Sequence, residues 1–158
     1  MFGRFLIISF AYLHAGNIPL TSQSIVTVNV NESIVYVGLS TSTEIWVYVK
    51  EGYHIQANKV NDESLVPTTL EVKSNEFITI DKQEFPPSKQ FKLDGTDSIL
   101  QVYDGKFVIK LFINSVANTK AGKYVLTAKL KYQACDSRTC LFPRTVDFSI
   151  PLEVKTKE

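Results

Sequence analysis

The chain has no excess of charge of either sign and few residues that bind metal ions. Its 158 residues include 17 Lys and Arg, 16 Asp and Glu, 2 Cys and 2 His, for a formal net charge of +1. This balance argues against the basic surface by which proteins bind nucleic acids or anionic membranes. A structural zinc site needs four Cys or His ligands, so zinc is also disfavoured. We expect proteins or small molecules as partners, no nucleic acid and no cofactor.

No apolar run is long enough to span a bilayer. The run from Phe5 to Leu13 follows a single positive charge at Arg4 and ends shortly before the small residue Ala15. This order is typical of a secretory signal peptide. The sequence predicts a signal peptide over residues 1–15 and a periplasmic or otherwise extracytoplasmic domain, where disulfides can form. The alternatives are a first strand or an expression artefact.

Sustained helical periodicity is absent, and alternation with period two takes its place from Ser24 onward. Apolar residues at every second position are typical of strands with one face on a core and one in water. The runs are Val26, Val28 and Val30; Ile45, Val47 and Val49; Phe107, Ile109, Leu111 and Ile113; Tyr124, Leu126, Ala128, Leu130 and Tyr132; and Val146, Phe148, Ile150, Leu152 and Val154. With turn residues between the runs, they predict an all-β, antiparallel, immunoglobulin-like β-sandwich, one domain over residues 20–158.

One segment, residues 81–100, breaks the alternation. It contains Pro86-Pro87 and holds Phe85, Phe91 and Leu93 in a context too irregular for a strand. A long irregular segment in a compact domain is usually functional or disordered. Its apolar residues indicate that it packs on something, and covering an edge of the sandwich is the simpler explanation.

Both cysteines lie in the stretch KYQACDSRTCLFPRT, residues 131–145. A Cys135–Cys140 bridge closes a loop of about six residues and adds roughly 2 kcal/mol by chain entropy, which is little for a structural staple. Two thiolates can also hold Cu(I). A small-looped, accessible disulfide is typical of a labile redox pair, in which Arg138 favours a thiolate and Asp136 opposes it. The residues alone leave a structural bridge, a copper-handling module and a redox couple open.

Three stretches resemble a known family: YQACDSRTCLFPRTVDFSIPLEV, EGYHIQANKVNDESLVPTTLEV and FPPSKQFKL, within residues 25–155. Tyr132, Gln133, Cys135 and Cys140 stand in the order found in the N-terminal periplasmic domain of the thiol:disulfide interchange protein DsbD. Pro143 follows in that order, and His54 falls in the upstream signature of the family. One departure is Phe142, which replaces the first of two prolines that often follow the second cysteine.

The resemblance implies an immunoglobulin-like domain that works as a protein-disulfide reductase or electron carrier. Such a domain takes reducing equivalents from a thioredoxin-like protein, itself fed across the membrane. It passes them to periplasmic proteins such as disulfide isomerases and cytochrome c maturation factors. Because the chain ends at Glu158 without a membrane domain, we expect a stand-alone relative or a fragment with a separate membrane electron donor.

By the same resemblance, Cys140 forms mixed disulfides with partners and Cys135 resolves them. A cap loop of the family carries an aromatic residue that shields the cysteines, and the segment from Phe85 to Ser98 is its counterpart, with Phe91 as the shielding residue. His54 either tunes the cysteines or is a strand-end histidine satisfied by backbone groups. The competing hypotheses are a secreted β-sandwich binding module with a structural hairpin disulfide and a Cu(I)-handling module.

Overall fold

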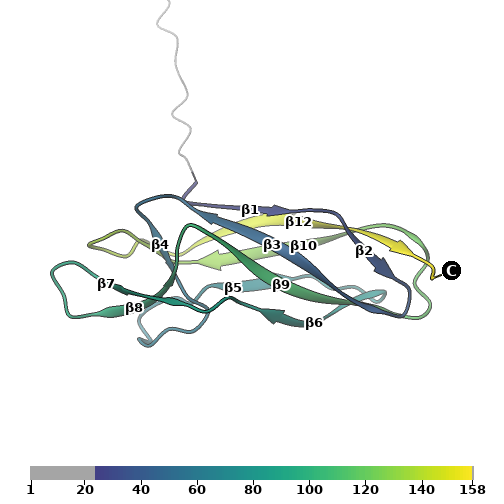
Figure 1. The fold of residues 1–158 in the computed structure, drawn as a ribbon, viewed down its shortest axis with the longest axis horizontal. Coiled ribbons are helices and arrows are strands. Elements are labelled where there is room, and N and C mark those ends of the chain that lie inside the picture. Colours follow the sequence, from purple (N-terminus) through teal and green to yellow (C-terminus); the bar gives the residue numbers. More distant parts are fainter. Residues whose placement is uncertain (1–23, 158) are drawn as a thin grey trace, which may run out of the picture.

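The computed structural model describes residues 24–157 of the chain, and in that part it contains strands and turns but no helix. The predicted signal peptide lies outside the described residues. No helix among the described residues is able to cross a membrane. Figure 1 shows an elongated molecule whose long strands run along its length, with a group of shorter strands at one end.

Two four-stranded sheets form the sandwich. The first has the order β1-β3-β9-β6 and is antiparallel throughout, with β1 at Val26–Val30, β3 at Ser40–Val49, β9 at Lys106–Ser115 and β6 at Ile78–Glu84. The second has the order β2-β12-β10-β5, with β2 at Ser33–Tyr36, β12 at Arg144–Lys155, β10 at Gly122–Tyr132 and β5 at Thr69–Val72. Only the β2–β12 pairing in this sheet is parallel. The predicted all-β, immunoglobulin-like sandwich is confirmed.

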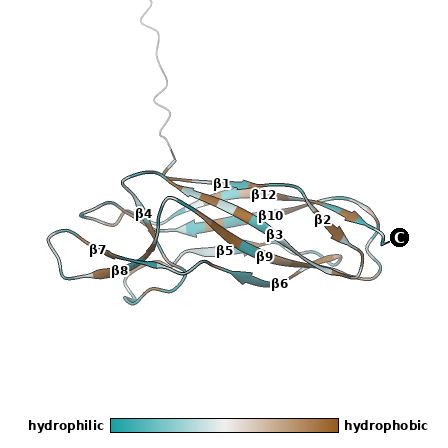
Figure 2. Cartoon of the chain, viewed as in Figure 1, coloured by the Kyte–Doolittle hydropathy of each residue, from teal (hydrophilic) through white to brown (hydrophobic). Residues whose placement is uncertain are grey.

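The core lies between these sheets, on the faces that the alternation predicts. Along β10 the burial alternates residue by residue from Leu126 to Tyr132. In Figure 2, hydrophobic and hydrophilic colours both occur along the long strands, as on β3. The residues at 2 % exposure or less include Ile45, Val47, Ile109, Leu111, Ile113, Leu126, Ala128, Leu130, Ile150, Leu152 and Val154. Side chains of both sheets therefore contribute to one continuous core.

A third, smaller sheet lies at one end of the molecule and has the order β11-β4-β8-β7. Its strands are β11 at Ala134–Cys135, β4 at His54–Gln56, β8 at Ile99–Tyr103 and β7 at Lys89–Lys92. In Figure 1 this end is on the left, opposite the C-terminal end of the chain. The third sheet brings the first cysteine beside strands that are distant from it in the sequence.

The third sheet corrects the prediction that residues 81–100 are too irregular for a strand. The segment contains the end of β6, all of β7 and the start of β8. Pro86 and Pro87 fall between β6 and β7, because a proline cannot donate to a strand ladder. Gly95, with a φ of 75°, forms the turn between β7 and β8. The segment is thus largely a β-hairpin rather than a loop.

Candidate functional site

Cys135 and Cys140 form a disulfide within the connection from β10 to β12. The two residues face each other as an isolated antiparallel bridge, with their Cα atoms 3.9 Å apart. Two backbone hydrogen bonds frame the bridge: Leu141 N–H donates to Ala134 O at 2.7 Å, and Asp136 N–H donates to Thr139 O at 3.0 Å. The disulfide therefore spans a tight hairpin loop.

The two cysteines differ in their exposure to solvent. Cys135 is 0 % exposed, whereas Cys140 is partly exposed. Cys140 also lines a shallow hollow together with Phe142 and Pro143. Phe142 itself is 92 % exposed, the largest fraction among the exposed large hydrophobic residues of the described chain. A partner can thus reach the sulfur of Cys140 more easily than that of Cys135.

Asp136 holds the turn between the cysteines. Its Oδ1 accepts the backbone N–H groups of Arg138 and Thr139, each at 2.8 Å. These hydrogen bonds, with a smaller contribution from the Arg138 charge, lower the pKa of the Asp136 carboxyl below its usual 3.8. The sequence suggested that Asp136 opposes thiolate formation, but its hydrogen bonds show that it also organises the loop.

His54 lies beside the disulfide. It is the cross-strand partner of Cys135 in the β4–β11 pairing. Its Nδ1 atom is buried without a hydrogen-bond partner, so the alternative of a histidine satisfied by backbone groups does not describe this nitrogen. The imidazole instead stacks on the ring of Phe91.

Gln56, two residues along β4, is a site residue that the sequence analysis did not single out. It is 0 % exposed, and its Nε2 donates to Cys135 Sγ at 3.2 Å and to Cys140 Sγ at 3.7 Å. The sequence carries one signal for it: a polar residue between Ile55 and Ala57, which are both apolar. A polar side chain inside an apolar strand is usually buried with a specific partner.

The β7–β8 hairpin covers the buried sulfur. Leu100 and Val102 form a buried apolar cluster with Cys135, and Phe91, Leu93 and Cys140 are partly buried residues that pack against it. Asp94 N–H donates to Ser137 O at 2.8 Å, which links the hairpin turn to the cysteine loop. The expected cap is therefore found over the disulfide, although as a hairpin.

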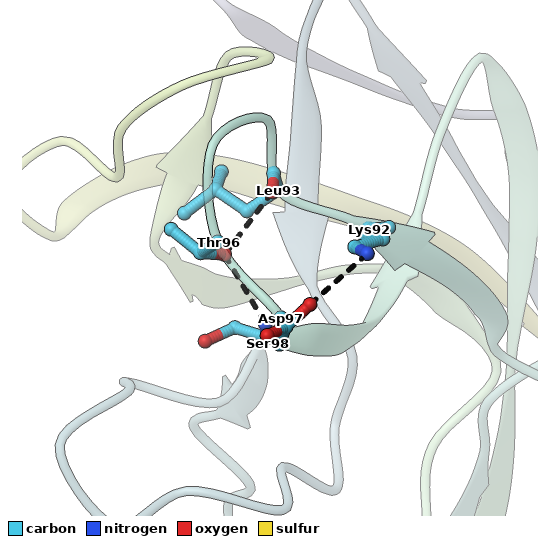
Figure 3. Close-up of polar contacts among 5 residues, drawn as sticks. All are labelled: Lys92, Leu93, Thr96, Asp97 and Ser98. Atoms are coloured by element: carbon cyan, nitrogen blue, oxygen red, sulfur yellow. Dashed lines mark hydrogen bonds and ion pairs between the residues drawn. The ribbon is translucent and has the colours of Figure 1, made fainter.

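The tip of this hairpin is held by its own polar contacts. Figure 3 shows Thr96, whose hydroxyl donates to Leu93 O at 3.1 Å and accepts the Ser98 N–H at 3.1 Å. Lys92 Nζ lies 3.2 Å from the Asp97 carboxylate, but both side chains are exposed, so this ion pair adds little. These contacts shape the turn at the tip of the hairpin.

Phe85, also expected in the cap, does not lie with the cysteines. It packs against the main core, and its ring centroid is 6.4 Å from that of Tyr103. The reason is that Phe85 directly follows β6, a strand of the first sandwich sheet. Of the three residues, Phe91 and Leu93 cover the disulfide.

The remaining site residues support the loop. Gln133 joins two segments: its Oε1 accepts Val66 N–H at 2.8 Å, and its Nε2 donates to Leu141 O at 3.1 Å. Tyr132 is 2 % exposed in the main core, and its burial raises the pKa of its phenol, with Arg144 opposing the shift. Among the described residues, no group of three or more His, Cys, Asp and Glu is placed to hold a metal ion.

These features define a class: an immunoglobulin-like sandwich that carries a half-buried disulfide under a hairpin at one end. Residues 25–151 match the model of the family described as thiol:disulfide interchange protein DsbD, N-terminal. The chain belongs to this family, which connects it with thiol–disulfide interchange.

Solved structures agree with the fold. The N-terminal periplasmic domain of ScsB from Proteus mirabilis superposes with a TM-score of 0.52 at 16% identity, over 81% of this chain and 45% of that chain. The seventh ScaB type I cohesin from Pseudobacteroides cellulosolvens gives 0.50 at 10% identity, over 84% of this chain and 94% of that chain. At these identities the likeness concerns the fold alone, and the chain spans less than half of the ScsB chain. The search among curated proteins found no match.

Proposed function

We propose that the chain exchanges disulfides with other proteins through the Cys135–Cys140 pair, in the periplasm or elsewhere outside the cytoplasm. The observation that carries this proposal is the unequal exposure of the two cysteines, with Cys135 0 % exposed and Cys140 partly exposed. A structural disulfide needs no such asymmetry, but exchange needs one sulfur that a partner can reach and one that waits behind it. Membership in the DsbD family supports the same function, and the ScsB neighbour is a periplasmic domain.

The proposed reaction runs in two halves. A thiolate of the electron donor attacks Cys140 Sγ, the intramolecular S–S bond breaks, and Cys135 leaves as a thiolate with the bonding electron pair. A second thiolate of the donor then attacks its own half of the mixed disulfide and releases Cys140. The domain is now a dithiol, and the donor has become a disulfide.

In the second half, the Cys140 thiolate attacks a disulfide of the target protein and releases one target sulfur as a thiolate. Cys135 then attacks Cys140 Sγ, which restores the Cys135–Cys140 bond and releases the second target sulfur. Two electrons pass from donor to target, and no cofactor is needed. Cys140 is therefore the cysteine that meets partners, and Cys135 is the resolving cysteine.

The proposed partners are thioredoxin-like proteins as donors, with disulfide isomerases or cytochrome c maturation factors as targets. A separate membrane protein would supply the donor with electrons. Because Phe91 and Leu93 pack in the cluster that holds Cys135, a partner has to displace the β7–β8 hairpin or approach from the open side of Cys140. Gln133, which bonds to Val66 and Leu141, and His54, which pairs with Cys135, keep the loop in position for either approach.

A redox titration of the purified domain tests the proposal. The protein is equilibrated with glutathione or dithiothreitol buffers, its thiols are alkylated, and the reduced fraction is measured by mass. Structural disulfides of secreted proteins commonly lie below about −300 mV, and we expect a less negative potential here. A potential well below that limit would indicate an inert structural disulfide. The β-sandwich binding module would then describe the protein better. A stoichiometric Cu(I) complex that the double Cys→Ala variant loses would instead support copper handling.

A further inference from the structure

The side chain of Gln56 touches both reacting sulfurs from inside the protein. Its Nε2 lies 3.2 Å from Cys135 Sγ and 3.7 Å from Cys140 Sγ. Within residues 24–157, these are the hydrogen bonds that reach the disulfide. The amide therefore contacts the atoms between which the S–S bond breaks and forms.

Keeping an amide at this place costs stability. Gln56 is 0 % exposed, and its Oε1 has no hydrogen-bond partner. Three buried side-chain atoms of the described chain lack a partner, and two of them, His54 Nδ1 and Gln56 Oε1, lie on β4 next to the disulfide. A buried polar atom without a partner is unfavourable, and a disulfide sulfur is only a weak acceptor. Packing alone would favour an apolar residue here, so the amide calls for a functional explanation.

The backbone of Gln56 is fixed on both sides. Its N–H donates to Gln133 O at 2.9 Å. Its carbonyl oxygen accepts the hydroxyl of Thr68 at 2.5 Å, and Gln56 is also the register partner of Val102. The amide is thus held against the sulfurs by the third sheet, and no ordering of a loop is needed for the contact.

We propose that Gln56 is a catalytic residue of the exchange reaction, an inference that rests on the proposed function. When a donor thiolate attacks Cys140 Sγ, the electron pair of the S–S bond moves to Cys135 Sγ. Gln56 Nε2–H, already directed at that sulfur, donates a hydrogen bond to the thiolate as it forms. A hydrogen bond to a charged group is about twice as strong as one between neutral groups, so the contact is stronger in the transition state than in the disulfide.

The two distances also favour attack on one of the two sulfurs. Because the shorter hydrogen bond goes to Cys135, Gln56 stabilises Cys135 as the leaving thiolate more than it stabilises Cys140. Attack on Cys140 is favoured, and this is the cysteine that is partly exposed. In the second half of the cycle, the same hydrogen bond keeps Cys135 deprotonated and ready to attack Cys140. The neutral amide performs this function in a pocket where no helix N-terminus is present.

The test compares Gln56→Met with a matched control. Met has nearly the same length as Gln but no N–H donor, so it removes the hydrogen bond and retains the volume. Thr43→Val is the control: Thr43 is 3 % exposed and its hydroxyl bonds with that of Ser33 in the sandwich, so this variant also loses a buried polar contact. Each variant is checked for folding by circular dichroism before the exchange reaction is measured.

Two quantities are measured. The first is the second-order rate constant for reduction of the disulfide by dithiothreitol, which we expect to fall about tenfold in Q56M, the effect of one hydrogen bond to a charged group. The second is the pKa of the Cys135 thiol in a Cys140→Ala background, read from thiolate absorbance at 240 nm. Removing the donor should raise this pKa by about one unit. T43V should leave the rate, and in the same background the thiol pKa, at the wild-type values.

The outcomes separate this inference from the proposed function. If the wild-type disulfide is redox-active but Q56M retains both its rate and its thiol pKa, Gln56 has no catalytic role and the proposed function stands. If the wild-type potential lies in the range of structural disulfides, the proposed function fails, whatever Q56M does. Should Q56M not fold, Gln56→Glu replaces it. Its carboxylate accepts instead of donating, so the rate relative to that of the wild type at the same pH must fall as this group ionises, and a ratio that does not change with pH would overturn the inference.

Discussion

The imidazole of His54 stacks on the ring of Phe91, with the centroids 3.8 Å apart and the planes inclined by 28°. His54 is also the register partner of Cys135. The stack therefore joins the β7–β8 hairpin to the strand that pairs with the buried cysteine. Phe91 lies on the edge strand β7, where the third sheet has no further neighbour. This is one of the contacts through which the hairpin covers the disulfide.

Shortening Phe91 should open the cover without unfolding the domain. Because Phe91 is only partly buried, we expect Phe91→Ala to cost about 1 kcal/mol, well below the 3–5 kcal/mol of a fully buried Phe. The reduced protein should react several-fold faster with Ellman's reagent or small oxidants, since the sulfurs lose part of their apolar cover. Stopped-flow measurement of the thiol reaction and a urea titration give the two values.

Phe85→Ala is the matched control for this variant. Phe85 packs against the main core near Tyr103, so its removal should lower stability and leave the reactivity of the thiols unchanged. Equal acceleration in both variants would indicate general loosening of the domain and would contradict a covering function of Phe91.

Trapping experiments should show different functions for the two cysteines. In Cys135→Ala, a mixed disulfide between Cys140 and a thioredoxin-like partner cannot be resolved internally, so the covalent complex should accumulate. In Cys140→Ala, the remaining sulfur is the one that is 0 % exposed in the native protein, and the complex should be scarce. Non-reducing gels measure the yields. Equal yields from both variants would show that the assignment of roles is wrong.

The sandwich could be predicted because its signals are local. From Tyr124 to Tyr132, every second residue is apolar, and one face of β10 is buried as this alternation requires. Strand β7 could not be predicted in the same way, since its sequence KQFK contains a single apolar residue. It forms a strand because it pairs with β8, and no pattern in its own sequence predicts that pairing.

The residues that contact the disulfide could not be predicted from the sequence for a related reason. Gln56 and Cys135 are 79 residues apart in the chain and meet only through the β4–β11 pairing. That pairing consists of short strands, for which alternation is too brief to show a register. The cysteines themselves, the loop between them and the presence of a cover could be predicted, but the side chains of β4 that contact the sulfurs could not.

Low pH should weaken the hydrogen bonds by which Asp136 stabilises the turn between the cysteines. The pKa of this carboxyl is lowered in the folded protein by hydrogen bonds from Arg138 and Thr139, so its contribution to stability is present above the unfolded value and is lost as pH falls through the folded one. Below the usual 3.8, the amides of these two residues should lose protection from hydrogen exchange. In Asp136→Asn, which cannot titrate, their protection should not change over that range. Exchange measured by NMR at several pH values compares the two proteins, and identical profiles would contradict the function assigned to Asp136.

Phe142 should increase the rate of exchange with protein partners but not the rate with small thiols. It is 92 % exposed next to Cys140, and an exposed aromatic residue beside a reactive sulfur is suited to anchor a partner. Phe142→Ser should change stability by no more than about 0.5 kcal/mol, because the side chain buries almost nothing in the free protein. The rate of exchange with a thioredoxin-like donor should fall about fivefold or more, an effect of about 1 kcal/mol, while the rate with dithiothreitol stays constant.

Val125→Ser is the control, since Val125 is also exposed, at 62 %, but lies on β10 and outside the hollow that Cys140 lines. If both variants slow the protein partner equally, the surface around Cys140 has no special contact with it; if neither does, Phe142 does not anchor the partner.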